Sequence, residues 1–162
     1  MLVNLDVAKS SSYSETVPSD STERTYYIKA EQIEWDYSPN GFQHGCFAQN
    51  LKEDSALWLQ TGDYSIGSKR QKLRFVEYTD DSFTNQKSQP SYHGILGPLI
   101  AAEVGDTVKV VLKNDIPIDG ENVNFALGGG FVELNGTDTN KVITPGETYT
   151  YRWMVPAEVS DC

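Results

Sequence analysis

Bulky apolar and polar residues alternate along four segments of the chain, which are residues 25–37, 71–80, 106–115 and 143–156. This two-residue period is typical of β-strands with one buried face. Turn-forming residues separate the segments, and only a short patch at 51–59 favours a helical turn. Strands that follow one another without long intervening helices predict an all-β domain, folded as a sandwich or a barrel.

The alternation also predicts which side chains are buried. In residues 106–115, one face carries Val108, Val110 and Leu112, and the other carries Lys109 and Lys113. The apolar face is therefore expected to be the core side of this strand. The other side chains predicted to face inward are Leu73, Phe75 and Tyr78, together with the aromatic residues Tyr26, Trp35, Tyr149, Tyr151 and Trp153.

Composition narrows the possible partners. The length of 162 residues suits one domain, and residues 8–24 are Ser/Thr-rich and poor in apolar residues, so we interpret them as a linker. The formal net charge of −10 disfavours nucleic acid and anionic membranes as partners, because like charges repel.

Location stays open between two alternatives. No apolar run approaches the roughly 18 residues that a membrane helix needs, so no membrane segment is expected in this chain. The N-terminus also lacks the basic and apolar regions of a signal peptide. The chain is therefore either intracellular or a secreted segment whose signal lay upstream.

Four phrases occur in a fixed order along the chain: YYIKAEQIEWDYSPNG, LRFVEYTDDSFT, HGILGPLIAAEVGDTVKVVLKN and ITPGETYTYRWMVP. In this order and spacing the chain resembles the first half of a paired cupredoxin unit of the ceruloplasmin and hephaestin multicopper ferroxidases. It is also similar to the A domains of coagulation factors five and eight. The resemblance implies a secreted protein and a cupredoxin-like Greek-key β-sandwich over residues 25–162 that lacks its last strands in this chain. Residues 1–7 resemble the end strand of a preceding domain.

The GILGP phrase has a structural expectation of its own. Its Gly-Pro pair, Gly97 and Pro98, is predicted to turn the chain into a buried apolar segment that ends at the turn before the strand of residues 106–115.

The chain differs from the family it resembles at the positions of the copper-binding histidines. A blue-copper site takes two His and one Cys, often with a weak axial Met, and the family's trinuclear site takes His-X-His pairs. Alignment on VKVVLKN and PGETYTY places one such pair at Ala126 and Gly128, neither of which can bind copper. The chain has two histidines. The remaining copper candidates are His44 with Cys46, and His93. A solvated surface residue is the simpler interpretation of His44, and the position of His93 is not a ligand in the family pattern.

Three further sites are implied by the resemblance or by a motif. The family has a calcium site in the loop before PGE, where Glu133, Asp138 and Asn140 offer hard oxygen ligands. The family's paired aspartates are replaced there by TNKVIT, so a solvated polar turn is the alternative. The triplet NGT makes Asn135 an N-glycosylation acceptor in a secreted protein. The resemblance also implies a disulfide from Cys162 to a cysteine outside this chain.

Two functions follow as expectations. The first is a structural, interface-forming domain of a secreted, ceruloplasmin-like multidomain protein whose other domains hold copper and oxidise iron(II). The second is a copper-free interaction or assembly module resembling coagulation-factor A domains. Both predict that sister cupredoxin domains or another chain complete the sandwich, and neither places a catalytic residue in this chain.

Overall fold

The computed structural model describes residues 21–39, 43–44, 49–50, 59–117, 122–125, 131–134, 136–138 and 140–156. The elements within these ranges are β1 (Glu23–Asp36), β2 (Gln43–His44), β3 (Gln49–Asn50), β4 (Thr61–Gly62), β5 (Ser65–Ile66), β6 (Lys69–Tyr78), the 3-10 turn η1 (Ser91–His93), β7 (Thr107–Asn114), β8 (Val132–Glu133) and β9 (Thr148–Met154). The predicted all-β fold is confirmed. The helical patch expected at 51–59 falls almost wholly outside the described residues. No helix in the described part of the chain is long and apolar enough to span a membrane.

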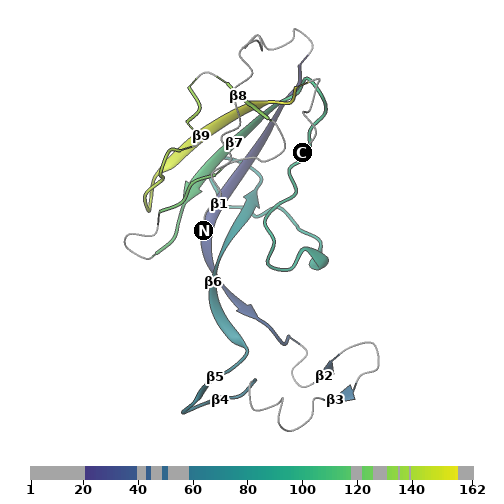
Figure 1. Cartoon of the computed structure of the whole chain (residues 1–162), viewed down its shortest axis with the longest axis vertical. Helices are drawn as coiled ribbons and strands as arrows, with labels where there is room; N and C mark the ends of the chain where they lie inside the picture. Colours follow the sequence, from purple (N-terminus) through teal and green to yellow (C-terminus); the bar gives the residue numbers. More distant parts are fainter. Residues whose placement is uncertain are drawn as a thin grey trace, which may run out of the picture.

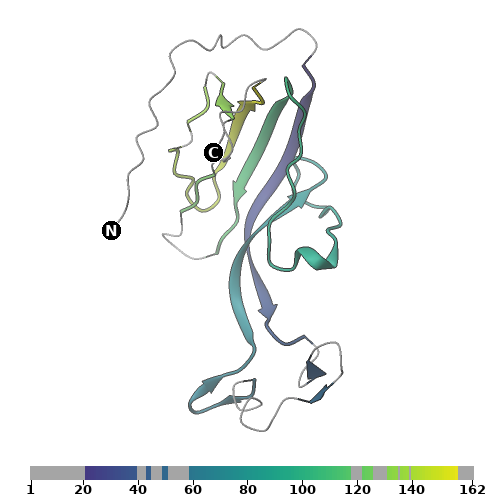
Figure 2. The same ribbon diagram turned by 45° about the vertical axis from the view of Figure 1, so that its right-hand side comes forward.

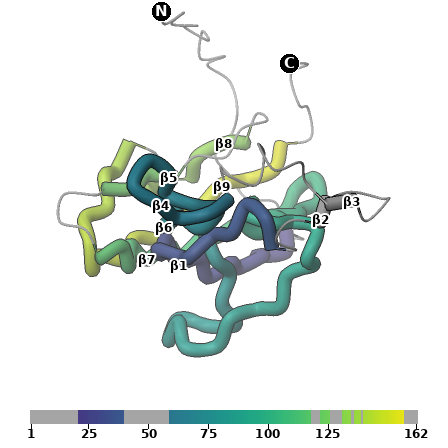
Figure 3. Tube along the Cα trace, turned by 90° about the horizontal axis from the view of Figure 1, so that it is seen from below, coloured from purple at the N-terminus to yellow at the C-terminus, as the bar shows by residue number. Residues whose placement is uncertain are grey.

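Five strands form one mixed sheet in the order β6-β1-β7-β9-β8 (Figure 1). β1 and β7 run parallel, and the other neighbouring pairs are antiparallel. Figure 3 shows that the loop leaving β6 extends away from the sheet on the side opposite β8. This mixed sheet is consistent with a cupredoxin-like β-sandwich.

A two-stranded arm projects from the sheet. β1 pairs with β6 as far as Asp36 and Lys69, whereas its pairing with β7 ends at Ala30 and Asn114. The second half of β1 and the first half of β6 therefore continue alone beyond the sheet, and β4 and β5 lie at their far end (Figures 1 and 2). We call this extension the β1–β6 arm.

The main hydrophobic core covers one face of the sheet. Its fully buried side chains are Ile28, Val108, Val110, Leu112, Ile143, Tyr151 and Trp153. Tyr151 and Trp153 stack with ring centroids 5.3 Å apart, and Phe125 packs against both. The predicted inward face of the strand at 106–115 is thus confirmed, as is the burial of Tyr151 and Trp153.

A smaller cluster covers the opposite face. Val76, Tyr78 and Phe83 are buried there, with Tyr27 and Val111 packed against them. Tyr78 is therefore buried, as predicted, but on the face opposite Phe75. Residues that are an odd number of positions apart in one strand point to opposite faces of the sheet.

Two predicted core residues lie on the arm instead. Leu73 is 46% exposed, because its cross-strand partner is Gln32, beyond the point where β7 stops pairing with β1. Trp35 is partly buried outside the main core, with its ring edge-on to Tyr37 at 6.5 Å. For Leu73 the predicted face is correct, but the sheet does not extend far enough to cover it. Trp35 is an odd number of positions after Ile28 of the main core in the same strand, so it points to the opposite face.

The segment after the Gly-Pro pair is also more exposed than expected. Leu96 and Leu99 are 67% and 71% exposed, and Val104 is 64% exposed, so the prediction of a buried apolar segment is wrong for these side chains. The segment does cross β6 closely: a Cβ added to Gly97 would lie 3.4 Å from the Cβ of Phe75. It lies against the sheet through Ile100 and Ala102, which pack against the main core.

Polar anchors fix the two ends of β7. Asp106, which is 6% exposed, accepts hydrogen bonds from the Arg24 side chain and from the Glu103 amide. At the other end, the buried Asn114 side chain donates to the Ile143 carbonyl at 2.9 Å and accepts from the Ile116 amide at 3.1 Å. Arg24 belongs to β1 and comes just before the predicted start of the domain at residue 25.

Candidate functional site

The two histidines lie in different parts of the fold. His44 is in β2, beyond the end of the β1–β6 arm, whereas His93 ends η1 beside the main sheet (Figures 1 and 2). Cys46, the sulfur candidate next to His44, lies outside the described residues. The structure therefore does not bring His44 and His93 together as a ligand pair.

His93 sits against an aromatic neighbour. Its ring meets the Tyr92 ring edge-on, with centroids 4.9 Å apart. Its Nδ1 atom is buried and has no hydrogen-bond partner among the described residues. No carboxylate, thiolate or second imidazole joins it in a cluster within that part of the chain.

The donor set does not fit a copper centre. The full sequence contains two histidines and two cysteines, fewer nitrogen ligands than a blue-copper site and a trinuclear site need between them. In the described ranges, no three residues of the types His, Cys, Asp and Glu gather as metal ligands. Ala126 and Gly128 lie outside those ranges, but the preceding Phe125 packs into the aromatic core, 5.5 Å from the Phe75 ring.

The calcium candidates are spread along the β8–β9 connection. Glu133 is in β8 and pairs with Trp153 of β9. The Asp138 carboxylate accepts a hydrogen bond from the Asn140 amide at 2.9 Å, which is a local turn that needs no ion. Asn135, the glycosylation candidate, and Cys162, the disulfide candidate, lie outside the described residues.

The same connection is tied to β9 by Tyr149. Its hydroxyl donates to the Gly136 carbonyl at 3.1 Å and accepts from the Asp138 amide at 3.0 Å. Nearby, Lys141 and Glu147 form an ion pair at 2.8 Å. The ion pair lowers the pKa of the Glu147 carboxyl and raises the pKa of the Lys141 ammonium. The acidic group just before β9 is therefore already neutralised.

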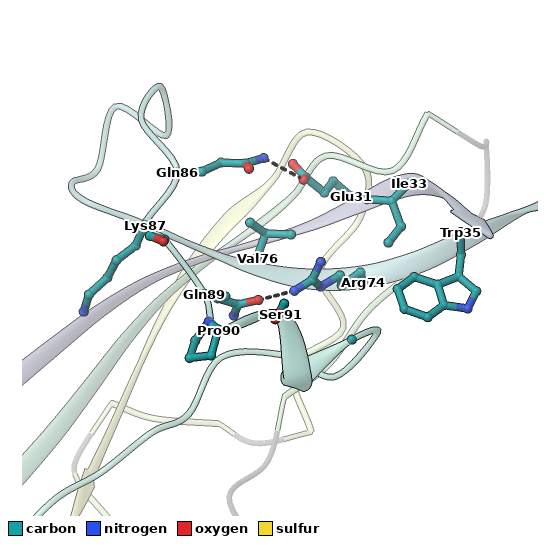
Figure 4. Close-up of a pocket in the computed structure, with 12 residues that line it drawn as sticks. Glu31, Ile33, Trp35, Arg74, Val76, Gln86, Lys87, Gln89, Pro90 and Ser91 are labelled. Atoms are coloured by element: carbon teal, nitrogen blue, oxygen red, sulfur yellow. Dashed lines mark hydrogen bonds between the residues drawn. The ribbon is translucent and has the colours of Figure 1, made fainter. Parts of the chain in front are cut away.

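A concave site lies on the arm. A pocket of about 510 Å³ opens between one face of the β1–β6 arm and the loop that follows β6 (Figure 4). Its lining residues are Glu31, Ile33, Trp35, Arg74, Val76, Gln86, Lys87, Ser88, Gln89, Pro90, Ser91 and Gly94. Its volume falls within the range of small-ligand and peptide side-chain pockets.

Arg74 and Glu31 face each other across the two strands of this pocket. Arg74 donates from Nε to the Leu96 carbonyl at 3.3 Å and from Nη2 to the Gln89 side chain. The Glu31 carboxylate instead accepts from the Tyr78 hydroxyl at 2.8 Å and from Gln86 at 3.2 Å. It is also 3.5 Å from the Lys29 ammonium. Glu31 is thus satisfied by groups other than Arg74.

Sequence comparison supplies the relationship of the chain to known proteins. The multicopper oxidase family model matches residues 76–161. The chain belongs to the multicopper oxidase family. Ferroxidase HEPHL1 from Homo sapiens is 37% identical, with 85% of this chain and 13% of that protein covered. Ceruloplasmin from Rattus norvegicus is 38% identical, with 84% of this chain and 14% of that protein covered.

The family also reaches beyond oxidases. Coagulation factor VIII from Sus scrofa is 38% identical, with 82% of this chain and 6% of that protein covered. The resemblance inferred from the four phrases is therefore confirmed. The chain spans between 6% and 14% of the length of these relatives.

Sequence reasoning missed the pocket on the arm. Its residues come from β1, from β6 and from residues 86–94, which only the fold brings together. One signal was available: Lys72 and Arg74 alternate within the predicted strand of residues 71–80, and Arg70 continues this alternation just before it. A strand with that period places all three on one face.

Proposed function

We propose that this chain is a cupredoxin-type structural domain of a larger, secreted protein. In that protein it forms an interface and supplies no complete copper site. Its family membership supports the cupredoxin assignment, and the shortage of copper donors supports a role outside electron transfer. The iron-oxidising activity suggested by the relatives' names would then depend on other domains.

The exposed apolar segment between η1 and β7 carries the proposal. Ile95, Leu96, Leu99 and Val104 are 36%, 67%, 71% and 64% exposed. Large apolar side chains gathered along one segment are characteristic of surfaces that pack against another protein or domain. In a chain that covers only a small part of its relatives' length, a sister cupredoxin domain is the partner that we propose for this segment.

A copper-free interaction module is the second candidate. The similarity to coagulation factor VIII supports it, since the match covers 82% of this chain at 38% identity. Both candidates assign the same role to the chain itself and differ in whether the larger protein binds copper.

Extracellular location belongs to the same proposal. N-glycosylation of Asn135, calcium binding by the loop of Glu133, Asp138 and Asn140, and pairing of Cys162 with a cysteine of another segment are proposed as further features of the secreted protein. They rest on the motif and on family membership.

Metal analysis of the native protein and of the 162-residue chain tests the proposal. We expect the chain alone to bind no copper in stoichiometric amounts, because it lacks the histidine ligands. Copper in the native protein, with the strong blue absorption of a Cys-bound cupric ion, would favour the oxidase candidate, and its absence would favour the interaction module. Stoichiometric copper bound tightly by the isolated chain would contradict the proposal.

A further inference from the structure

One face of the arm carries three positively charged side chains in series. Arg70, Lys72 and Arg74 occupy alternate positions of β6, where their cross-strand partners are Trp35, Ile33 and Glu31. We call these three cations the basic stripe. Because next-but-one residues of a strand are about 7 Å apart on the same face, the stripe presents charge at regular intervals.

The charges of the basic stripe are not neutralised by described residues. Seven other cations in the described ranges form ion pairs: Arg24, Lys29, Lys69, Lys87, Lys109, Lys141 and Arg152. An eighth, Lys113, lies over the Phe83 ring at 5.7 Å. Four described cations therefore have no carboxylate within ion-pair distance, and three of these four lie side by side on one strand. The chain as a whole has a net charge of −10.

Neutral groups hold these cations in place. Arg70 donates from Nη1 to the Ile66 carbonyl at 2.7 Å, and Lys72 lies over the Tyr37 ring at 5.4 Å. Arg74 is held by the Leu96 carbonyl and by Gln89. Each side chain is partly buried and oriented, but no negative charge compensates it within the described structure. An incoming carboxylate would meet preorganised donors, which lowers the entropy cost of binding.

The pocket at Arg74 adds specificity to this end of the stripe. Trp35, Ile33, Val76 and Pro90 supply apolar walls (Figure 4). The Nε2 donor of Gln89 is buried without an acceptor among the described residues. A guanidinium accommodates a carboxylate with two parallel hydrogen bonds, and Arg74 retains donors beyond the two that are occupied.

We propose that the basic stripe binds an acidic peptide segment in an extended conformation, with one of its carboxylates placed at Arg74 in the pocket. An extended chain repeats its side chains at the same interval as the stripe, so carboxylates at every second residue match the three cations. β6 lies at the edge of the sheet, which leaves space beside it for another chain. The net charge of −10 disfavours long-range attraction of anions, so recognition depends on contacts made within about 10 Å. This proposal does not depend on whether the larger protein binds copper.

Fluorescence polarisation with the full chain tests the proposal. The probe is a fluorescein-labelled peptide that alternates Glu and Thr over seven residues, and a matched peptide with Gln in place of Glu is its control. We expect the Glu peptide to bind and the Gln peptide not to bind. Affinity is expected to fall as salt rises, because the contacts are charge pairs at the surface.

Two triple variants with the same net charge distinguish binding at the basic stripe from a general effect of the charge of the chain. Replacing Arg70, Lys72 and Arg74 together with Gln should weaken binding by about tenfold or more. The charge-matched control replaces Lys69, Lys109 and Lys141 with Gln and should leave binding within about twofold. Arg74→Gln and Arg74→Lys as single variants keep the test informative if the triple variant does not fold, and Arg74→Lys should bind less tightly because it loses the two-pronged contact.

The indole N–H resonance of Trp35 gives an independent readout by NMR. It should shift when the Glu peptide binds, whereas the resonance of Trp153, which is buried in the main core, should stay in place. Absence of binding at low salt would overturn the proposal. So would equal loss of binding in the two triple variants, or tighter binding to a sulfated oligosaccharide or to anionic vesicles than to the peptide.

Discussion

The charge of Asp106 joins distant parts of the chain. Its carboxylate accepts from the Glu103 amide at 2.9 Å and from the side chain of Arg24, which lies in another strand. These hydrogen bonds lower the pKa of Asp106 below its ordinary value, the Glu103 amide contributing most. They stabilise the ionised form, and therefore the folded state that provides them.

Acid should therefore remove the contribution of Asp106. A carboxyl group with a lowered folded-state pKa stabilises the fold above its ordinary pKa of about 4, and this contribution is lost as pH falls through the lowered value. We expect Asp106→Asn to be less stable than the parent chain at pH 7, with the difference shrinking below about pH 4. Urea unfolding followed by circular dichroism between pH 2 and 7 measures this.

Asp81→Asn is the matched control, because Asp81 is on an exposed loop. A constant difference between the parent chain and Asp106→Asn across this pH range would contradict the prediction. The sequence predicted a turn before the strand at this position, but it could not predict the role of Asp106. That role depends on Arg24, which is far away in sequence and reaches Asp106 only through the parallel pairing of β1 with β7.

At the scale of elements, Tyr26 joins β1 to the exposed apolar segment. Its hydroxyl donates to the Ala101 carbonyl at 2.7 Å and accepts from the Ala101 amide at 3.0 Å. A single side chain thus satisfies both backbone groups of one residue in a segment that is not part of the sheet.

Loss of this hydroxyl should loosen the segment and leave the sheet intact. For Tyr26→Phe we expect faster hydrogen exchange at the Ala101 amide and a loss of about 1 kcal/mol in the free energy of unfolding. Tyr92→Phe is the control, since Tyr92 is 82% exposed. Amide exchange followed by NMR gives the answer, and unchanged protection of Ala101 in Tyr26→Phe would count against this role.

The strands themselves were predictable because their signal is local. The alternation in residues 106–115 located β7 and its buried face, and the Pro-Gly turn located the start of β9, where Gly146 has a φ of 86°. Leu73 was misplaced because its strand was correct but the neighbouring strand ends early, and Trp35 was misplaced because it points to the face opposite the main core. Which strand outlasts its neighbours is a property of the sheet, and the period of a single segment does not contain it.

At the scale of the whole molecule, the segment of residues 95–104 carries four large apolar side chains, Ile95, Leu96, Leu99 and Val104, that the described structure leaves exposed. We expect the chain to self-associate through this segment when no sister domain covers it. Replacing Leu96 and Leu99 together with Ser should lower the weight-average mass in sedimentation equilibrium.

Tyr92→Ser provides the control, because it removes an exposed aromatic side chain outside this segment. If the Leu96 and Leu99 variant associates as strongly as the parent chain, the interface lies elsewhere.

Some features of the candidate sites could be predicted from the sequence and others could not, as for the strands. The shortage of copper ligands was predictable, since it needs only a count of histidines and an alignment of family phrases. The pocket was not predictable, because its walls come from β1, from β6 and from the loop that follows β6, which only the fold brings together. The small number of histidines is thus a property of composition, whereas the basic stripe and its pocket depend on the topology of the sheet.

The position of β1 between β6 and β7 also constrains how the protein folds during synthesis. β1 is synthesised early and pairs with β6 on one side and β7 on the other, and Glu23 must wait for Thr107 to emerge from the ribosome. Contacts between such distant residues slow folding, since a long loop has to close first. The hairpin with β6 can form earlier, so β1 would carry one open edge while translation continues. We therefore expect nascent chains that end before residue 107 to bind chaperones, and this dependence to end once β7 has emerged.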